Sequence, residues 1–247
     1  MKKYSSKIEK KIIKKIGIAI ERYNLFEDGD RILVGISGGK DSFAMLKLMK
    51  ILQKRAPVKY EIIPAMVIGD FKGFSLKPIF EYVGKEGFFL ISYFMPIEKI
   101  LREKGKRLRT ICSFCSRLRR GALYQMAMSL GCNKIALGHH ADDLMETFFL
   151  NMFYNATLRA MSPNYLAENE KVKVIRPLIL VFEDEIKEYA RRENIPSFPF
   201  GCPIEEIKER ERGKTKIFLK ELEKKIPGVK ENILKSLSNI KEETFLK

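Results

Sequence analysis

One segment of the sequence has the composition of a phosphate site: Ser37-Gly38-Gly39-Lys40-Asp41-Ser42 lies between a short apolar run and an amphipathic stretch. Glycines let the backbone approach an anion, and the N–H groups and dipole of a helix start favour negative charge. Lys40 adds a point charge for phosphate oxygens. This is not a Walker A loop, because Asp41 follows Lys40 and no glycine stands five residues before Gly39. A plain tight turn is the alternative, but the Lys-Asp-Ser order favours nucleotide binding.

A second polar segment, Gly138-His139-His140-Ala141-Asp142-Asp143, holds both histidines of the chain and opens an amphipathic stretch. Two carboxylates in a first helical turn can simply interact with the helix dipole, and the histidines can simply pack. Both polar segments, however, follow apolar runs of the buried-strand type. Strand ends of one parallel sheet lie at one edge, so we expect the two segments to be neighbours where phosphates and a magnesium ion bind.

The four cysteines are Cys112, Cys115, Cys132 and Cys202. Four thiols in a chain of this length, without a secretory signal, do not suggest a disulfide scaffold. The Cys-x-x-Cys pair fits a redox pair, half of a zinc site or part of an iron–sulfur cluster. Cys132 precedes a core strand and should be buried and inert, whereas Cys202 lies in a proline-rich turn and can approach the pair. We expect the other three thiols to share a metal centre; on a four-iron cluster they leave one iron open.

The elements that must position these residues alternate between strands and helices. Apolar runs predict five strands, at 31–36, 60–68, 88–94, 133–138 and 171–179. Helical spacing predicts helices at 7–22, 40–53, 77–86, 116–130, 141–153, 183–193, 214–225 and 229–240. In the fifth of these, apolar residues from Ala141 to Phe153 form a single stripe that should face the core.

This alternation predicts an α/β fold with a doubly wound, mostly parallel five-stranded sheet. The predicted domains are a basic N-terminal helix at 1–25, a domain at 26–200 that carries both polar segments, and a small helical appendage at 201–247. The ligand should bind at the carboxyl ends of the strands.

Composition indicates a polyanionic partner. The net charge is +16, and the segment from Glu98 to Arg120 contains nine Lys or Arg but only two Glu. Such a field suits nucleic acid; a charged thermophile surface is the alternative, but it does not explain the excess of one sign. No apolar run approaches the ~20 residues of a membrane span, and the first residues lack the apolar core of a signal peptide. We expect a cytoplasmic protein with no membrane partner.

The segment Ser37–Ser42 resembles the PP-loop of the adenine nucleotide alpha-hydrolase-like superfamily, whose members cleave ATP between the α- and β-phosphates and transfer AMP to an oxygen. The segment from His139 to Asp143 resembles the His-His-x-Asp-Asp motif of its tRNA-modifying branch. The strongest match is Cys112-Ser113-Phe114-Cys115-Ser116-Arg117-Leu118-Arg119-Arg120-Gly121, which is similar to the tRNA 2-thiocytidine synthetase family, as is Leu150–Tyr154. The resemblance runs from Ser37 past Cys202, to Pro227-Gly228.

The resemblance implies ATP-dependent thiolation of an anticodon-loop cytidine, at tRNA position 32. It implies that ATP and Mg²⁺ bind at Ser37, Gly38, Gly39, Lys40, Asp41, Ser42 and Gly138. Asp143, Lys40 and Arg119 are the implied catalytic residues, with Asp143 acting on the target base or the metal. In that family three cysteines hold a [4Fe-4S] cluster whose free iron carries the sulfur; here these are Cys112, Cys115 and Cys202.

Other functions stay open at this point. A related enzyme that thiolates a T-loop uridine has paired zinc-finger cysteines at both ends, which this chain lacks. A lysidine-synthetase-like ligase would share both nucleotide motifs but use no cluster. A non-catalytic RNA-binding protein and a thiol redox protein are the remaining alternatives. The expected partners are tRNA and a sulfur donor, either sulfide or the persulfide of a cysteine desulfurase, and a homodimer is left open.

Overall fold

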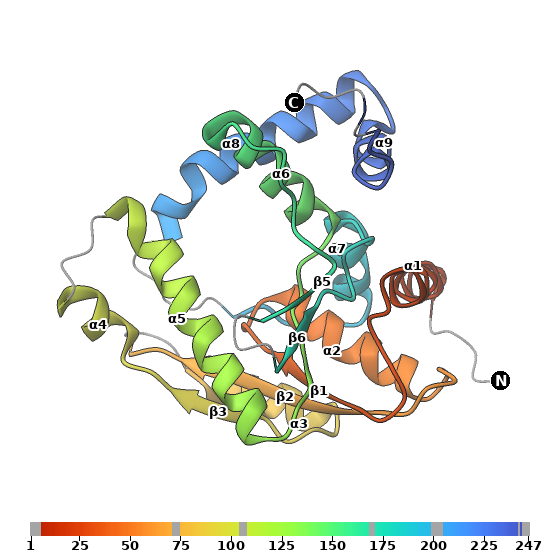
Figure 1. The fold of residues 1–247 in the computed structure, drawn as a ribbon. Coiled ribbons are helices and arrows are strands. Elements are labelled where there is room, and N and C mark those ends of the chain that lie inside the picture. The colour runs from red at the N-terminus through yellow and green to blue at the C-terminus, as the bar shows by residue number, and fades with distance from the viewer. Residues whose placement is uncertain are drawn as a thin grey trace.

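The computed structural model describes residues 6–70, 75–103, 108–167, 171–198, 205–241 and 243, with only the backbone at 108–113 and 205–210. This part of the chain contains a six-stranded sheet in the order β3-β2-β1-β4-β6-β5 (Figure 1). The strands are β1 (Asp30–Gly35), β2 (Tyr60–Ile68), β3 (Ile91–Phe94), β4 (Lys134–Ala136), β5 (Asn164–Leu166) and β6 (Lys173–Ile175). All neighbours pair in parallel except β5 and β6. The predicted doubly wound, mostly parallel α/β fold is confirmed.

The strand order reverses at β1. The chain proceeds from β1 outward through β2 to β3 and then returns with β4 on the other side of β1. In open α/β sheets a crevice forms outside the carboxyl ends of the strands at such a reversal, and ligands bind there. Both polar segments singled out in the sequence follow these two strands, β1 and β4.

One face of the sheet is covered by α1 (Lys7–Tyr23), α2 (Lys40–Gln53), α3 (Lys77–Lys85) and α7 (Glu183–Arg192). Helix α2 packs on β1 and β2, and α7 packs between α2 and α1. Ile12 and Ile16 of α1 are fully buried, so the N-terminal helix belongs to the main core. Burying such side chains contributes roughly 1.5–3 kcal/mol each, which fixes α1 against the rest.

The other face carries α5 (Leu108–Ser129), which packs on β2 and β4 and is preceded by α4 (Ile97–Glu103). Its buried residues Ala122, Met126 and Ala127 meet Leu33 and Ile63 of the sheet in a second apolar cluster. Figure 1 shows α5 rising from this face past the carboxyl ends of the central strands. The helix therefore carries its first half to the ligand edge of the sheet.

Three more helices lie beyond that edge: α6 (Ala141–Asn155), α8 (Glu205–Lys225) and α9 (Val229–Ser236). Helix α8 packs along α6 and contacts α5 and α9 (Figure 1). Phe149 and Phe153 of α6 each lie 5.7 Å, between ring centroids, from Phe218 of α8. Among the described residues, no helix is both long and apolar enough to cross a membrane.

Several expectations about elements were wrong: among them, α8 begins at Glu205 and not at 214, and α4 was not expected. The sheet has six strands, because the three-residue strand β5 pairs antiparallel with β6 and is too short to show a periodic pattern. Helix α5 begins at Leu108 and not at Ser116, so the Cys-x-x-Cys pair lies inside the helix. The stripe on α6 faces the core only in its first half, since Phe153 is 49% exposed and meets α8 instead.

Candidate functional site

The predicted phosphate loop is held in shape by its own two serines. The Ser42 hydroxyl accepts the N–H of Ser37 at 3.2 Å and donates to the Gly39 carbonyl at 2.8 Å. The Gly39 N–H donates to Ser37 Oγ at 3.3 Å. Gly38 adopts a left-handed conformation with φ of 85°, which favours glycine because a Cβ would be strained there. Its carbonyl accepts the N–H of Phe198 at 2.9 Å, which ties the loop to the end of the main domain.

Helix α2 starts directly from this loop and offers hydrogen-bond donors. Gly39 is its N-cap and makes no side-chain capping bond. The first N–H groups of a helix have no partner within the helix, so those of α2 are available to an anion and the dipole adds to the attraction. The Lys40 ammonium lies at the same end, 3.1 Å from Asp41 Oδ1 and 3.6 Å from Glu183 Oε1.

The second polar segment lies against the first. A Cβ added at Gly138 would come within 3.2 Å of the Ser42 backbone nitrogen and 3.3 Å of the Asp41 carbonyl carbon. Only a glycine fits this approach without a shift of the α2 backbone. The two segments that follow β1 and β4 are therefore in contact, which confirms the expectation that they are neighbours.

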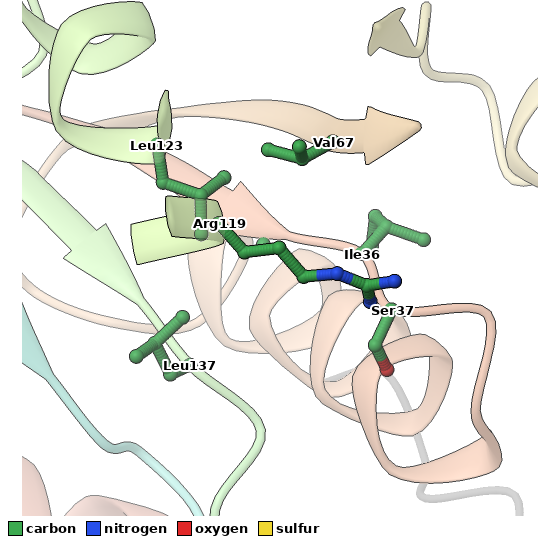
Figure 2. A pocket seen from close by; sticks show the side chains of 7 residues that line it. Ile36, Ser37, Val67, Arg119, Leu123 and Leu137 are labelled. Carbon is green, nitrogen blue, oxygen red and sulfur yellow. The ribbon is translucent and has the colours of Figure 1, made fainter. Parts of the chain in front are cut away.

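A cavity of about 100 Å³ opens beside the loop (Figure 2). Its walls are mostly apolar side chains and backbone from the ends of the central strands and from α5: Gly35, Ile36, Ser37, Val67, Arg119, Leu123 and Leu137. In Figure 2, Arg119 reaches from α5 toward Ile36 and Ser37. The structure thus brings Arg119 to the predicted phosphate loop, although α5 starts earlier than expected.

Asp143 is fixed at the start of α6 by a reciprocal cap. Its Oδ2 accepts the N–H of His140 at 3.0 Å, and its own N–H donates to His140 Nδ1 at 3.4 Å. Its other oxygen, Oδ1, lies 3.0 Å from Arg212 Nη2 of α8. Arg212 Nε also donates to Glu146 Oε2 at 2.8 Å, so one guanidinium joins two carboxylates one helical turn apart.

The two carboxylates differ in their electrostatics. Burial opposes ionisation of Asp143, but the charges of His140 and Arg212 outweigh it and hold the pKa of Asp143 below its ordinary value. For Glu146 burial is the stronger effect and raises the pKa despite Arg212. Asp143 therefore keeps its negative charge to lower pH than Glu146 does.

The C-terminal helices supply two more cations to acidic residues of this edge. Lys216 of α8 lies 2.8 Å from Glu183, and Lys230 of α9 lies 2.8 Å from Asp142. Asp142 also accepts the N–H of Glu183 at 2.7 Å. Burial opposes ionisation of Glu183, but hydrogen bonds from Lys216 and Lys187 lower its pKa to about 2. The C-terminal helices are thus joined to the candidate site by charge pairs on Asp142, Asp143 and Glu183.

The cysteine pair lies on α5 before Arg119. Cys115 is half-buried and packs, with Phe114 and Leu118, against Ile97 and Leu101 of α4. Cys112 is one turn earlier in the same helix; its side chain, like all of Cys202, falls outside the described residues. Within the described part, no three His, Cys, Asp or Glu side chains are grouped as a metal site. Cys132 is buried, as predicted, and burial raises its pKa to about 11, which suits an inert thiol.

The sequence pattern did not reveal several charged residues of this edge. Arg212 lies in a stretch that was expected to precede the helix, and Glu146, Glu183 and Lys230 looked like ordinary surface charges. Glu146 carried the one available signal, a carboxylate on the core-facing side of an amphipathic helix. The catalytic and binding roles of the predicted residues stay predictions, although the geometry brings Ser37, Gly138, Arg119 and Asp143 to one edge.

Comparisons with known proteins agree with this geometry. A family model described as a PP-loop domain matches residues 91–198. A tRNA-cytidine(32) 2-sulfurtransferase of Geobacter sulfurreducens is 42% identical over 237 residues, which cover 96% of this chain and 92% of that protein. One from Syntrophotalea carbinolica is 40% identical, with coverages of 96% and 92%.

A solved structure shares the fold. The U34-tRNA thiolase NcsA from Methanococcus maripaludis, with its [4Fe-4S] cluster, matches with a TM-score of 0.72 at 22% identity, covering 94% of this chain and 78% of that one. With relatives above 40% identity along nearly the whole sequence, the chain belongs to the tRNA-cytidine(32) 2-sulfurtransferase family.

Proposed function

We propose that this tRNA sulfurtransferase uses ATP to adenylate the C2 carbonyl of cytidine 32 in a tRNA anticodon loop and replaces that oxygen by sulfur. Family membership supports tRNA thiolation. The observation that carries the finer proposal is the placement of Arg119 on α5, one turn after Cys115 and in the wall of the cavity beside Ser37. An ATP-activating site and a cysteine pair therefore share one helix.

The glycine loop binds the phosphates of the nucleotide, and the adjoining cavity binds its nucleoside. The N–H groups at the start of α2, together with Lys40, receive the phosphates. The apolar walls formed by Ile36, Val67 and Leu137 suit a nucleoside base, and their position at the strand ends is the usual one for such a ligand. Asp41, the carboxylate closest to the Lys40 ammonium, would hold Mg²⁺, which would offset the negative charge of the phosphates.

The chemical step is a transfer of AMP. The O2 atom of the cytidine attacks the α-phosphorus, the bond from that phosphorus to the bridging oxygen breaks, and pyrophosphate leaves. Lys40 and the α2 N–H groups stabilise the negative charge that develops on the leaving group. Arg119 neutralises the α-phosphate during attack. In the second step a sulfur nucleophile bonds to C2, and AMP leaves with the former O2.

Asp143 is ionised, and its orientation suits an interaction with the target base or the metal ion. Its carboxylate is held by the His140 N–H and by Arg212, so its position is set by both polar segments and α8. It either orients the exocyclic amine of the cytidine by accepting a hydrogen bond or binds the magnesium ion; both roles need the charged form that its lowered pKa provides.

Cys112, Cys115 and Cys202 would hold the [4Fe-4S] cluster. Two cysteines three residues apart on a helix lie ~5–6 Å from each other, which suits two thiolates of one cluster. When bound, the cluster would supply sulfide-level sulfur for the second step, replaced either by sulfide or by the outer sulfur of a desulfurase persulfide after a thiol reductant has supplied two electrons and cleaved its S–S bond. The position of Cys115 on the same helix as Arg119 brings that sulfur toward the adenylate.

Two transcripts test the first step. Unmodified tRNA with cytidine at position 32 should stimulate release of AMP and pyrophosphate from ATP, and a transcript with uridine at that position should not. Equal release with both transcripts would contradict the proposal. Lysidine in the product would instead assign the chain to the cluster-free ligases.

Two cysteine variants, one of them a control, test the second step. After anaerobic reconstitution, Cys115→Ser should lose bound iron and thiolation, whereas the matched control Cys132→Ser should keep both, since Cys132 is buried away from the pair. Full activity of Cys115→Ser would refute the cluster assignment.

A further inference from the structure

One buried cation near the second polar segment, Arg176, forms no ion pair with any carboxylate of the described part of the chain. Arg176 follows β6 at the ligand edge of the sheet and is only 7% exposed. Its Nε donates to His139 Nδ1 at 3.3 Å and its Nη1 to the carbonyl of Ser162. Tyr165 also hydrogen-bonds to the guanidinium, and the groups that act most strongly on Arg176 are tyrosines and Arg120, with no Asp or Glu of the described residues among them. Burying an unpaired charge is costly, so such a cation is expected to meet an anion from outside the chain.

The partners of Arg176 are uncharged and therefore do not neutralise its positive charge. Burial and the nearby Arg176 charge lower the pKa of His139 to about 4, so at neutral pH this imidazole is uncharged and serves as an acceptor. Tyr165 of β5 lies beside the guanidinium, with its ring centroid at 5.2 Å. The acid that acts most strongly on His139 is Asp143, and that carboxylate is already paired with Arg212.

Helix α5 extends this cluster to the surface. Tyr124 lies 3.2 Å, between hydroxyl oxygens, from Tyr165. Arg120 is one turn before Tyr124 on the same face of α5, is exposed, and acts electrostatically on Arg176. The neighbouring face of α5, with Arg119 and Leu123, lines the cavity beside the glycine loop. The helix therefore borders two sites.

We propose that Arg176 and Arg120, together with Tyr165 and Tyr124, form a phosphate-binding subsite separate from the glycine loop, which holds a backbone phosphate of the tRNA next to the reacting nucleotide. Two arginines supply charge-assisted hydrogen bonds to a phosphodiester, and the tyrosines supply hydroxyl donors and aromatic faces on which an unstacked base can rest. The inference rests on the proposed function for the identity of its ligand.

The position of the subsite favours RNA over the phosphates of ATP. The donors of the glycine loop lie between β1 and α2, whereas Arg176 lies beyond β4, after β6. Arg120 opens the subsite to solvent, as a long polymer requires. Free pyrophosphate has the same chemistry and is the competing source of the anion, so both are measured.

The experiment uses the full chain and needs no turnover. The affinity for unmodified tRNA is measured as a function of salt for wild type, Arg120→Gln and Arg176→Gln, and the affinity for inorganic pyrophosphate is measured in parallel. Each arginine variant should lower tRNA affinity by about tenfold, and the slope of log K against log salt should fall by about 0.7–0.9. Lys59→Gln, an exposed charge before β2 at the opposite edge of the sheet, is the matched control and should change neither.

The outcomes separate the possibilities. Loss of pyrophosphate affinity alone would keep the phosphate subsite but assign it to the leaving group. Unchanged binding of both ligands by Arg120→Gln, a substitution of an exposed side chain, would overturn the inference. Arg176→Lys keeps the charge and should recover part of the affinity. A wild-type chain that binds no tRNA would refute the proposed function itself, whereas thiolation with unaltered slopes in the variants would refute only the subsite.

Discussion

Removing Arg212 should destabilise the fold and shift the pH dependence of activity, because this side chain joins Asp143 and Glu146 across α6 and α8. Its Nη2 and Nε lie 3.0 and 2.8 Å from the two carboxylates, and the Glu146 side chain is only 6% exposed. Breaking a fully buried pair costs about 3–5 kcal/mol. Arg212 is 39% exposed, so water replaces part of the interaction, and we expect a loss of about 2 kcal/mol in Arg212→Gln.

The pH dependence of this loss has a defined sign. The pKa of Asp143 is lowered in the fold, so its ion pair adds stability above the unfolded pKa of about 4 and loses it as the pH falls. The deficit of Arg212→Gln should therefore be largest near neutral pH and shrink as the pH falls below about 4. In the same variant the pKa of Asp143 rises, so the acidic limb of the pH profile for AMP release moves to higher pH.

Urea denaturation at several pH values measures the deficit as a shift in midpoint at constant slope. Adding Glu146→Gln to Arg212→Gln should recover about 1 kcal/mol, because the unpaired buried carboxylate is then gone. Arg192→Gln is the control: its pair with Glu188 is exposed on both sides, and the expected loss is below about 0.5 kcal/mol. A deficit in Arg212→Gln below about 0.5 kcal/mol, or one independent of pH, would refute the reasoning.

Three further predictions concern the nucleotide loop and the opposite edge of the sheet. Gly138→Ala should weaken ATP binding and cost about 1–3 kcal/mol in urea denaturation, because its Cβ would press on the α2 backbone at Ser42; unchanged ATP affinity by calorimetry would count against the described contact. Lys40→Met should lower the affinity for a non-hydrolysable ATP analogue at least tenfold through loss of a charged phosphate contact, and an affinity equal to wild type would exclude Lys40 from the phosphate site. Lys134→Met should cost about 3 kcal/mol, because the Lys134 side chain is 2% exposed and lies 2.7 Å from the equally buried Asp30; a loss below about 1 kcal/mol in thermal or urea unfolding would contradict this.

Elements with strong local signals could be predicted from the sequence. The bounds of α2 and β2 agree with the expected 40–53 and 60–68. In both cases the apolar pattern is continuous and glycine or proline residues mark the ends. The two positions that require glycine, Gly38 and Gly138, could also be predicted. A left-handed conformation at Gly38 and a close backbone approach at Gly138 both favour glycine over other residue types.

Elements and contacts that depend on distant residues could not be predicted. No helix was expected between the third predicted strand and Ser116, where basic residues are in excess. Helix α4 is held there by the packing of Ile97 and Leu101 against Phe114 and Leu118 of α5. Strand β5 forms only through pairing with β6. Arg212 and Arg176 gave no local signal, because their roles arise from contacts across 69 and 37 residues of the chain.

The central claim is that this chain exchanges the oxygen at C2 of cytidine 32 for sulfur. Its most direct test is mass spectrometry of nucleosides from unmodified tRNA after incubation with the anaerobically reconstituted protein, ATP, Mg²⁺ and sulfide. The account predicts 2-thiocytidine, mapped to position 32, from wild type and none from Asp143→Asn or Cys115→Ser. Thiouridine or lysidine in place of 2-thiocytidine, or unmodified tRNA despite a full iron content, would contradict it.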